Sequence, residues 1–232
     1  MRVCALFSGG KDSTYALHWA YLSGLEIACL MTILPQSYDS LMFHRPGIEL
    51  TSLQAKAMGF PQILHKARDG DEVKELKRLL KEVMRKYNIG GVVVGALSSD
   101  YQRVRINLIC EELGLKTYSP LWRKDQATYL VELVNEGFKF ILTSVSALGL
   151  TPDMLGKIFD ANLVRKLISK AQTYGFNPGL EGGEGETLVL DAPLFKKRLE
   201  IISSKIVRAG PNSWRLDIQE ARLVNKCRDS KD

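Results

Sequence analysis

Six consecutive residues near the start of the chain combine two glycines with a lysine, an aspartate and two serines. They are Ser8, Gly9, Gly10, Lys11, Asp12 and Ser13, and they follow the apolar run 3–7. The run predicts a buried strand, the glycines allow the backbone to turn close to a ligand, and Asp12 or Ser13 can cap a following helix. Backbone N–H groups at a helix N-terminus and a lysine ammonium both favour an anion. The segment therefore predicts a phosphate-binding loop.

The spacing separates this loop from the Walker A type. A Walker A loop has four residues between its first glycine and its Gly-Lys-Ser/Thr, whereas Lys11 directly follows the Gly9-Gly10 pair. The string Ser-Gly-Gly-Lys-Asp-Ser instead resembles the PP-loop of ATP pyrophosphatases, which release pyrophosphate from ATP. A glycine turn that binds nothing is the alternative.

A second polar segment follows another predicted strand. The run 90–97 predicts a buried strand in which Val92, Val93 and Val94 are flanked by glycines, and Gly95 allows close approach at its carboxyl end. The segment that follows contains Ser98, Ser99, Asp100, Tyr101, Gln102, Arg103 and Arg105. Because two arginines in the first turns of a helix oppose its dipole, Arg103 and Arg105 are better explained by a phosphate or carboxylate ligand. Gly95, Ser98 and Asp100 are candidates for binding a nucleotide.

A third segment, 177–187, alternates glycines with acids and contains Glu181, Gly182, Gly183, Glu184, Glu186 and Thr187. It lies between a predicted helix and a predicted strand, and its carboxylates are closely spaced. We therefore expect an ordered loop, and a flexible acidic linker is the alternative.

Strand-like and helix-like patterns alternate along the chain. Predicted strands cover 3–7, 27–34, 63–64, 90–97, 115–120, 138–145, 187–190, 199–207 and 214–223, and the last two form a hairpin over 210–212. Predicted helices cover 13–23, 47–58, 71–86, 126–136 and 160–174, and one more starts near Ser98 and stops at Gly114. The alternation is typical of right-handed βαβ units.

This pattern predicts an α/β fold: a doubly wound, Rossmann-like, mostly parallel sheet of the HUP type with helices on both faces, plus a smaller C-terminal α+β portion. Residues 1–148 are expected to form the PP-loop nucleotide-binding domain and 149–232 a smaller substrate-binding domain. Since ligands bind at the carboxyl ends of such strands, 8–13 and 98–105 should converge on one crevice.

Composition and net charge restrict which class of protein this chain can be. The 232 residues are 45% hydrophobic and 25% charged with a net charge of +6, as in ordinary globular domains. The basic charge suits an anionic ligand, but the lysines and arginines of 72–86 alternate with glutamates as on a solvated helix face, so nucleic acid is not the expected partner. The oligomeric state, a homo-oligomer included, is left open.

The four cysteines and the hydropathy pattern suggest a compartment. Cys4, Cys29, Cys110 and Cys227 are far apart and form no zinc-type pair, so buried thiols in a reducing environment are expected. No apolar run approaches the length that spans a bilayer. We expect a cytoplasmic protein that does not enter a membrane.

Taken together, the motifs resemble one family, the diphthine–ammonia ligases, which complete diphthamide on elongation factor two. The resemblance rests on segments 8–13, 70–73, 99–105, 120–122, 147–150, 155–157, 181–187 and 191–195. The first segment marks a superfamily, whereas Ser-Asp-Tyr-Gln-Arg at 99–103 and Glu-Gly-Gly-Glu at 181–184 are narrower.

The resemblance implies an ATP-dependent amidation of diphthine through an acyl adenylate, with release of AMP and pyrophosphate and with free ammonium as nitrogen donor. ATP and Mg²⁺ are the implied cofactors, and Asp12 is the implied metal ligand. Lys11, Asp12, Arg103 and Arg105 take the catalytic roles. The implied substrate-binding residues are Tyr101, Gln102, Arg103, Glu181, Gly182, Gly183, Glu184, Glu186 and Thr187. Trp122 is a weaker candidate for contacting the trimethylammonium group.

The chain departs from the family pattern at three positions, and two other functions stay open. Asn107 stands where the family usually has Glu, Leu180 where Gly is usual, and Lys74 where an acid is common. The alternatives are a PP-loop enzyme that modifies tRNA and a non-enzymatic sensor of ATP or AMP.

Overall fold

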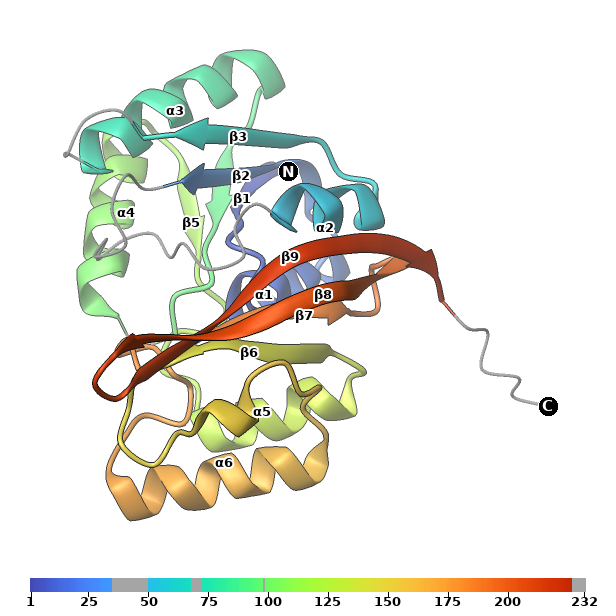
Figure 1. Cartoon of the computed structure of the whole chain (residues 1–232). Coiled ribbons are helices and arrows are strands. Elements are labelled where there is room, and N and C mark those ends of the chain that lie inside the picture. Colours follow the sequence, from blue (N-terminus) through green and yellow to red (C-terminus); the bar gives the residue numbers. More distant parts are fainter. Residues whose placement is uncertain (35–49, 68–71, 98, 227–232) are drawn as a thin grey trace.

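Five parallel strands form the first sheet of the computed structural model, which describes residues 1–34, 50–67, 72–97 and 99–226 (Figure 1). The strands are β1 (Arg2–Leu6), β2 (Glu26–Leu34), β3 (Gln62–Lys66), β4 (Gly91–Val93) and β5 (Lys116–Tyr118). Their order is β3-β2-β1-β4-β5, and every neighbouring pair is parallel. The chain therefore leaves β1 at the centre of the sheet, where the direction of winding reverses.

Helices cover both faces of this sheet, which confirms the doubly wound fold. They are α1 (Lys11–Leu22), α2 (Thr51–Met58), α3 (Glu72–Tyr87) and α4 (Asp100–Glu112). Cys4 of β1 packs in one core with Leu76 of α3 and Ile109 of α4, whereas the neighbouring Ala5 packs in the other core with Leu17 of α1. Successive side chains of β1 thus point to opposite helix layers.

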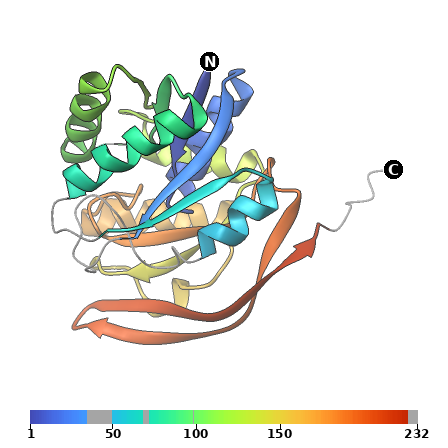
Figure 2. The ribbon, with the colours of Figure 1, turned by 90° about the horizontal axis from the view of Figure 1, so that it is seen from above.

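A second, antiparallel sheet has the order β7-β6-β9-β8. Its strands are β6 (Lys139–Val145), β7 (Gly185–Asp191), β8 (Lys197–Gly210) and β9 (Ser213–Asn225), and it is accompanied by α5 (Gln126–Asn135), the 3₁₀ turn η2 (Pro152–Met154) and α6 (Ala161–Tyr174). Figure 1 shows α5 and α6 lying below this sheet, and Figure 2 shows β8 and β9 as a long ribbon. The predicted hairpin is confirmed, because Gly210 pairs with Ser213 across the turn.

The prediction that 138–145 continues the parallel sheet is wrong. β6 pairs antiparallel with β7 and β9, and it makes no ladder with β5. Its core positions form a nearly continuous apolar run, and such a run is compatible with a buried strand of either direction. The chain leaves the first sheet after β5, before the boundary expected at residue 148, and the division into two domains stays a prediction.

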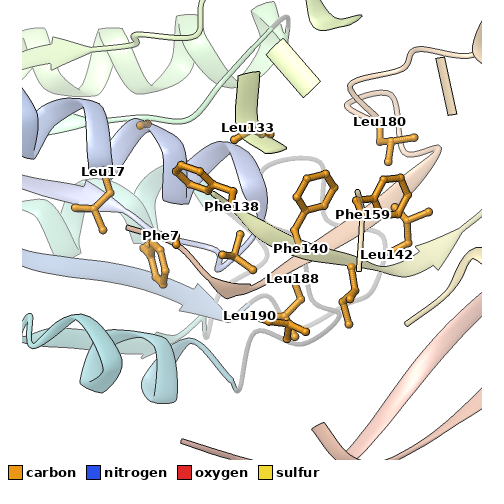
Figure 3. Close-up of a cluster of buried hydrophobic side chains, with 14 of the residues drawn as sticks. Phe7, Leu17, Leu133, Phe138, Phe140, Leu142, Phe159, Leu180, Leu188 and Leu190 are labelled. Atoms are coloured by element: carbon orange, nitrogen blue, oxygen red, sulfur yellow. The ribbon is translucent and has the colours of Figure 1, made fainter. Parts of the chain in front are cut away.

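One hydrophobic core joins the two sheets. Phe7 and Leu17 from the first half lie near Phe138 of the second (Figure 3), and the cluster extends to Phe140, which stacks on Phe159 with ring centroids 5.0 Å apart. The first sheet is therefore packed against the second through α1.

Among the residues described, no helix is both long and apolar enough to cross a bilayer.

Candidate active site

The glycine loop lies between β1 and α1, as the sequence predicts, but its helix cap is not the expected one. The helix begins at Lys11 with Gly10 as N-cap, and no side chain of its own first turn caps it. Instead, Thr187 of β7 accepts a hydrogen bond from the Lys11 N–H at 3.1 Å through its Oγ1. Capping by Asp12 or Ser13 is thus a wrong prediction, because a residue far away in sequence supplies the acceptor.

The Lys11 ammonium is buried and already has two partners. Its Nζ donates to Asp12 Oδ2 at 2.8 Å and to the Gly179 carbonyl at 2.6 Å, and the side chain is only 2% exposed. Asp12 Oδ1 is buried and has no hydrogen-bond partner among the described residues. The loop therefore holds a neutralised ion pair with one free carboxylate oxygen.

A largely apolar pocket opens at the carboxyl ends of β1, β2 and β4. Its lining residues are Leu6, Phe7, Ser8, Asp12, Ser13, Met31, Ile33, Val94, Gly95, Ala96, Gln102, Ile106 and Glu181. We call it the apolar pocket. An apolar wall with a few convergent polar groups at one side is typical of a site for a small organic ligand.

A smaller, polar pocket adjoins it. Its lining residues are Ser8, Gly10, Lys11, Asp12, Ser99, Gln102, Leu180, Glu181, Gly185, Glu186 and Thr187. We call it the acidic pocket, because three carboxylates face one ammonium. Both pockets contain Ser8, Asp12, Gln102 and Glu181. The three segments that the sequence singles out thus meet at one place.

The glutamates of the third segment have different surroundings. Glu181 accepts a hydrogen bond from the Leu97 N–H at 2.7 Å and lines both pockets. Glu184 instead accepts from the N–H groups of Asn177 at 3.1 Å and Gly182 at 2.6 Å. These bonds order the loop, which is not a flexible linker. They leave Glu181 and Glu186 as the carboxylates that face the acidic pocket.

Leu180 has a backbone conformation that favours glycine. Its φ is +63°, in the left-handed region, while its side chain is 5% exposed and packs in the shared core. A non-glycine residue in this region is uncommon, since its Cβ crowds the backbone. The leucine at this position therefore has a backbone cost, which the burial of its side chain offsets.

Both arginines of the second segment have partners on the protein. Arg103 Nη2 lies 3.2 Å from Asp100 Oδ1, and its guanidinium lies over one face of the Trp122 ring at 4.2 Å from the ring centroid. Arg105 stacks over the Tyr101 ring at 3.4 Å. From this segment Ser99 and Gln102 line the acidic pocket. The roles of the arginines stay predictions.

Gly95, Ser98 and Asn107 are three further positions that the sequence singles out near this site. Gly95 lies against the start of α1, where a Cβ would come within 2.7 Å of the Asp12 carbonyl carbon and the Ser13 nitrogen. Ser98 falls outside the described residues. The atoms Arg103 Nε and Asn107 Oδ1 are both buried without a partner in the described part of the chain. Asn107 therefore lies in the same helix as Arg103 with an unsatisfied amide oxygen.

Two residues near the loop are missing from the sequence-based candidates. The Tyr129 side chain is fully buried; burial first, and then the charge of Asp12, raise the pKa of Tyr129 well above its usual range. Gln54 of α2 is fully buried against the glycine loop. A polar residue on the inward face of a predicted helix is the only sequence signal that either position carries.

The fold and the loop define the class of protein: a doubly wound α/β protein with a PP-loop at the carboxyl end of its central strand. Two family models match the chain, the diphthamide synthase N-terminal domain over 1–117 and the diphthamide synthase C-terminal domain over 125–224. The chain belongs to the diphthamide synthase family, and it is an ATP-dependent ligase.

The relatives agree with this membership. Proteins named diphthine–ammonia ligase match from Bos taurus, with 34% identity over 100% of this chain and 98% of theirs, and from Danio rerio, with 40% identity over 89% of each chain. The Homo sapiens protein of the same name is 38% identical over 89% of this chain and 85% of its own. A solved chain from Methanocaldococcus jannaschii is titled a predicted subunit of tRNA methyltransferase. It aligns with 17% identity over 83% of this chain and 99% of its own, with a TM-score of 0.41.

Proposed function

We propose that this protein amidates diphthine on elongation factor two, using ATP and free ammonium, through an acyl adenylate with release of AMP and pyrophosphate. Family membership and the names of its relatives support diphthamide synthesis by amidation. The observation that carries the finer proposal is the pair of adjoining pockets, one apolar and one acidic, that share Ser8, Asp12, Gln102 and Glu181. Such a pair suits a nucleotide next to a cationic substrate.

The apolar pocket suits adenosine, and the loop suits its phosphates. Met31, Ile33 and Val94 provide apolar surface for a base, and Ser8 and Ser13 provide hydroxyl groups at the polar end. Lys11 can release Asp12 or Gly179 and stabilise the charge that develops on pyrophosphate as it leaves.

The loop also fits Mg²⁺. Asp12 offers a buried oxygen without a partner, and a magnesium ion bound to a nucleotide typically needs only one or two protein carboxylates. The described part of the chain contains no cluster of three or more histidines, cysteines or acids that could hold a metal without the phosphates. Asp12 would hold the ion, which when bound neutralises phosphate charge.

The acidic pocket suits a cation. Asp12, Glu181 and Glu186 line it together with Lys11 among the described residues. The trimethylammonium group of diphthine and the ammonium ion both carry a positive charge, and opposite charges attract strongly where water is partly excluded. Glu181 and Glu186 are therefore the residues that we assign to this charge.

The proposed reaction has two steps, and each bond that forms is matched by a bond that breaks. A carboxylate oxygen of diphthine bonds to the α-phosphorus of ATP, and the bond from that phosphorus to the bridging oxygen breaks, so pyrophosphate leaves. Ammonium gives up one proton to water, and the nitrogen of the resulting ammonia bonds to the acyl carbon. The bond from this carbon to the AMP oxygen breaks, and the nitrogen gives up a second proton to water. The contribution of the protein is to position both reactants and to stabilise charge.

The test is an incubation with ATP, ammonium and elongation factor two that carries diphthine. We expect one AMP and one pyrophosphate per amide, detected by chromatography and by mass spectrometry of the elongation factor, and no reaction when ammonium is omitted. Release of ADP would contradict the acyl adenylate. Nucleotide binding without pyrophosphate release in any mixture would favour the sensor, and retention of tRNA at physiological salt would favour the tRNA enzyme.

A cytoplasmic location stays a prediction.

A further inference from the structure

Gln54 is a polar residue buried at a place where the core is otherwise apolar. It lies in α2, outside the three segments that line the pockets, and its side chain is 0% exposed. Its helix neighbours Ala55, Ala57 and Met58 belong to the core that the two sheets share. Burial of a primary amide costs free energy unless its N–H groups have hydrogen-bond acceptors. The fold must therefore supply acceptors for Gln54 at this position.

The two amide hydrogens of Gln54 have acceptors in two different parts of the protein. Nε2 donates to the Gly9 carbonyl at 2.9 Å and to the Val189 carbonyl of β7 at 2.7 Å. The Gly9 carbonyl also accepts from the Val189 N–H at 3.0 Å. Gln54 thus joins the glycine loop of the first sheet to a strand of the second.

The hydrogen bonds of Gln54 fix the orientation of its side-chain amide, and the position of this amide restricts residue 9 to glycine. If the oxygen and nitrogen of the amide were exchanged, the oxygen would face two carbonyl oxygens. In the observed orientation Oε1 is buried without a partner in the described part of the chain, and a Cβ on Gly9 would lie 2.2 Å from it. Gly9 is therefore required by contact with Gln54 as well as by its φ of +80°.

The planar peptide unit between Gly9 and Gly10 couples the contact with Gln54 to the acidic pocket. The Gly9 carbonyl and the Gly10 N–H belong to one trans peptide unit and point in opposite directions. Two hydrogen bonds hold the carbonyl toward α2 and β7, so the N–H is directed away from them. Gly10 lines the acidic pocket, while the N–H of Lys11 is already bound to Thr187 and that of Ser8 to Ser13.

We propose that Gln54 is a positioning residue of the ligase: it anchors the Gly9 carbonyl and thereby aims the Gly10 N–H at the phosphates of ATP. The inference rests on the proposed function only through its use of ATP. A glutamine suits this role because it supplies two hydrogens without a charge. A glutamate of the same shape would place a carboxylate against two carbonyls, and a leucine would supply no donor.

The test compares Gln54→Leu with Gln62→Leu. Gln62 of β3 is a half-buried control glutamine: its Nε2 donates to Thr32 at 3.0 Å and to Thr51 at 2.8 Å, its Oε1 accepts from Ser52 at 2.9 Å, and none of these bonds joins it to segment 8–13. We expect Gln54→Leu to weaken the binding of Mg·ATP by about tenfold or more, measured by calorimetry, because a donor to phosphate loses its orientation. Gln62→Leu should lower the melting temperature and leave the ATP affinity within about twofold of wild type.

A measurement on the wild type does not depend on how the variants fold. The amide resonance of Gly10 in a ¹H–¹⁵N spectrum should shift strongly when Mg·ATP is added, and in Gln54→Leu this shift should shrink. Unchanged affinity in a folded Gln54→Leu protein, or a Gly10 resonance that saturating ATP leaves in place, would overturn the proposal. A wild type that binds ATP but does not amidate diphthine would contradict the proposed function and leave this test intact.

Discussion

Lys11 lines the acidic pocket at the glycine loop, and protein groups hold its ammonium in place. Its ammonium contacts Asp12 and Gly179 within the first turn of α1 and the third segment. A buried ammonium of this kind needs little reorganisation when a negatively charged leaving group forms. Its partners then change while its position does not.

We expect Lys11→Ala to lower the rate of pyrophosphate release by about a hundredfold or more, because loss of one preorganised donor has an effect of this size. AMP binding should be partly retained, since AMP lacks the phosphates that Lys11 faces. Single-turnover assays and AMP titrations measure the two effects. Lys170→Ala is the control, because Lys170 of α6 is a partly buried lysine whose Nζ donates to the Gly149 carbonyl at 2.6 Å, and it lines neither the apolar nor the acidic pocket. Turnover at the wild-type rate in Lys11→Ala would rule out this role.

His18 holds α1 to the segment after β7 in its neutral form. Its Nδ1 donates to the Thr14 carbonyl at 2.7 Å, and its Nε2 accepts from the Leu194 N–H at 3.0 Å. A protonated ring could not accept from Leu194. Burial lowers the pKa of His18 from 6.5 to about 4.

Stability should therefore fall as the pH decreases from about 6.5 to about 4. In this window the unfolded chain binds a proton at His18 that the folded protein does not, and the shift corresponds to about 3 kcal/mol in total. Urea unfolding at a series of pH values measures the slope. In His18→Gln, which does not titrate, the slope should be smaller across the same window. An equal slope in both proteins would contradict the assignment to His18.

The end of β4 and the start of α1 are in direct contact at Gly95. A side chain there would meet Asp12 and Ser13 backbone atoms at 2.7 Å, which real Cβ atoms do not tolerate. The glycine permits this close approach, and residues on both sides of the contact, among them Asp12, Ser13 and Gly95, line the apolar pocket.

Gly95→Ala should destabilise the fold by about 1–3 kcal/mol and weaken ATP binding, because the strand and the helix must move apart. Gly90→Ala is the control just before β4: a Cβ there would meet only the flexible Met1 side chain, at 3.3 Å. Urea titration and calorimetry measure the two quantities. If both variants bound ATP equally well, the contact at Gly95 would have no part in the site.

The whole protein is built around a core that both sheets share. Phe7 and Leu17 lie in the same cluster as Phe138, Phe140 and Leu188 (Figure 3). The loop itself is bound from the second sheet by Thr187 and Val189. Neither sheet can lose its packing without exposing apolar surface of the other.

We therefore expect one cooperative unfolding transition. Trp19 lies in α1 and Trp214 in β9, so two variants that each keep one of these tryptophans report on the two parts of the molecule. Their fluorescence midpoints in urea should coincide. Two separate midpoints would show that the residues 1–148 and 149–232, or the two sheets, unfold as independent domains.

Local patterns predict much of this protein correctly. The PP-loop, α3 with its apolar stripe, the ribbon of β8 and β9, and the parallel sheet all follow from periodicity, glycine spacing and capping residues within short windows. The family follows from motifs such as 99–103 and 181–184, and the family models confirm it. These features are encoded by residues that are neighbours in the chain.

Contacts between distant residues account for what the sequence does not reveal. The direction of β6 depends on β7, which lies beyond a whole helix, and an apolar run is the same in either direction. Thr187 caps a helix 176 positions away, and Gln54 reaches Val189 across 135 positions. No local pattern carries such a pairing, because packing of the whole chain brings the partners together. Only the tertiary structure could therefore decide how the glycine loop is anchored and which carboxylates face its pocket.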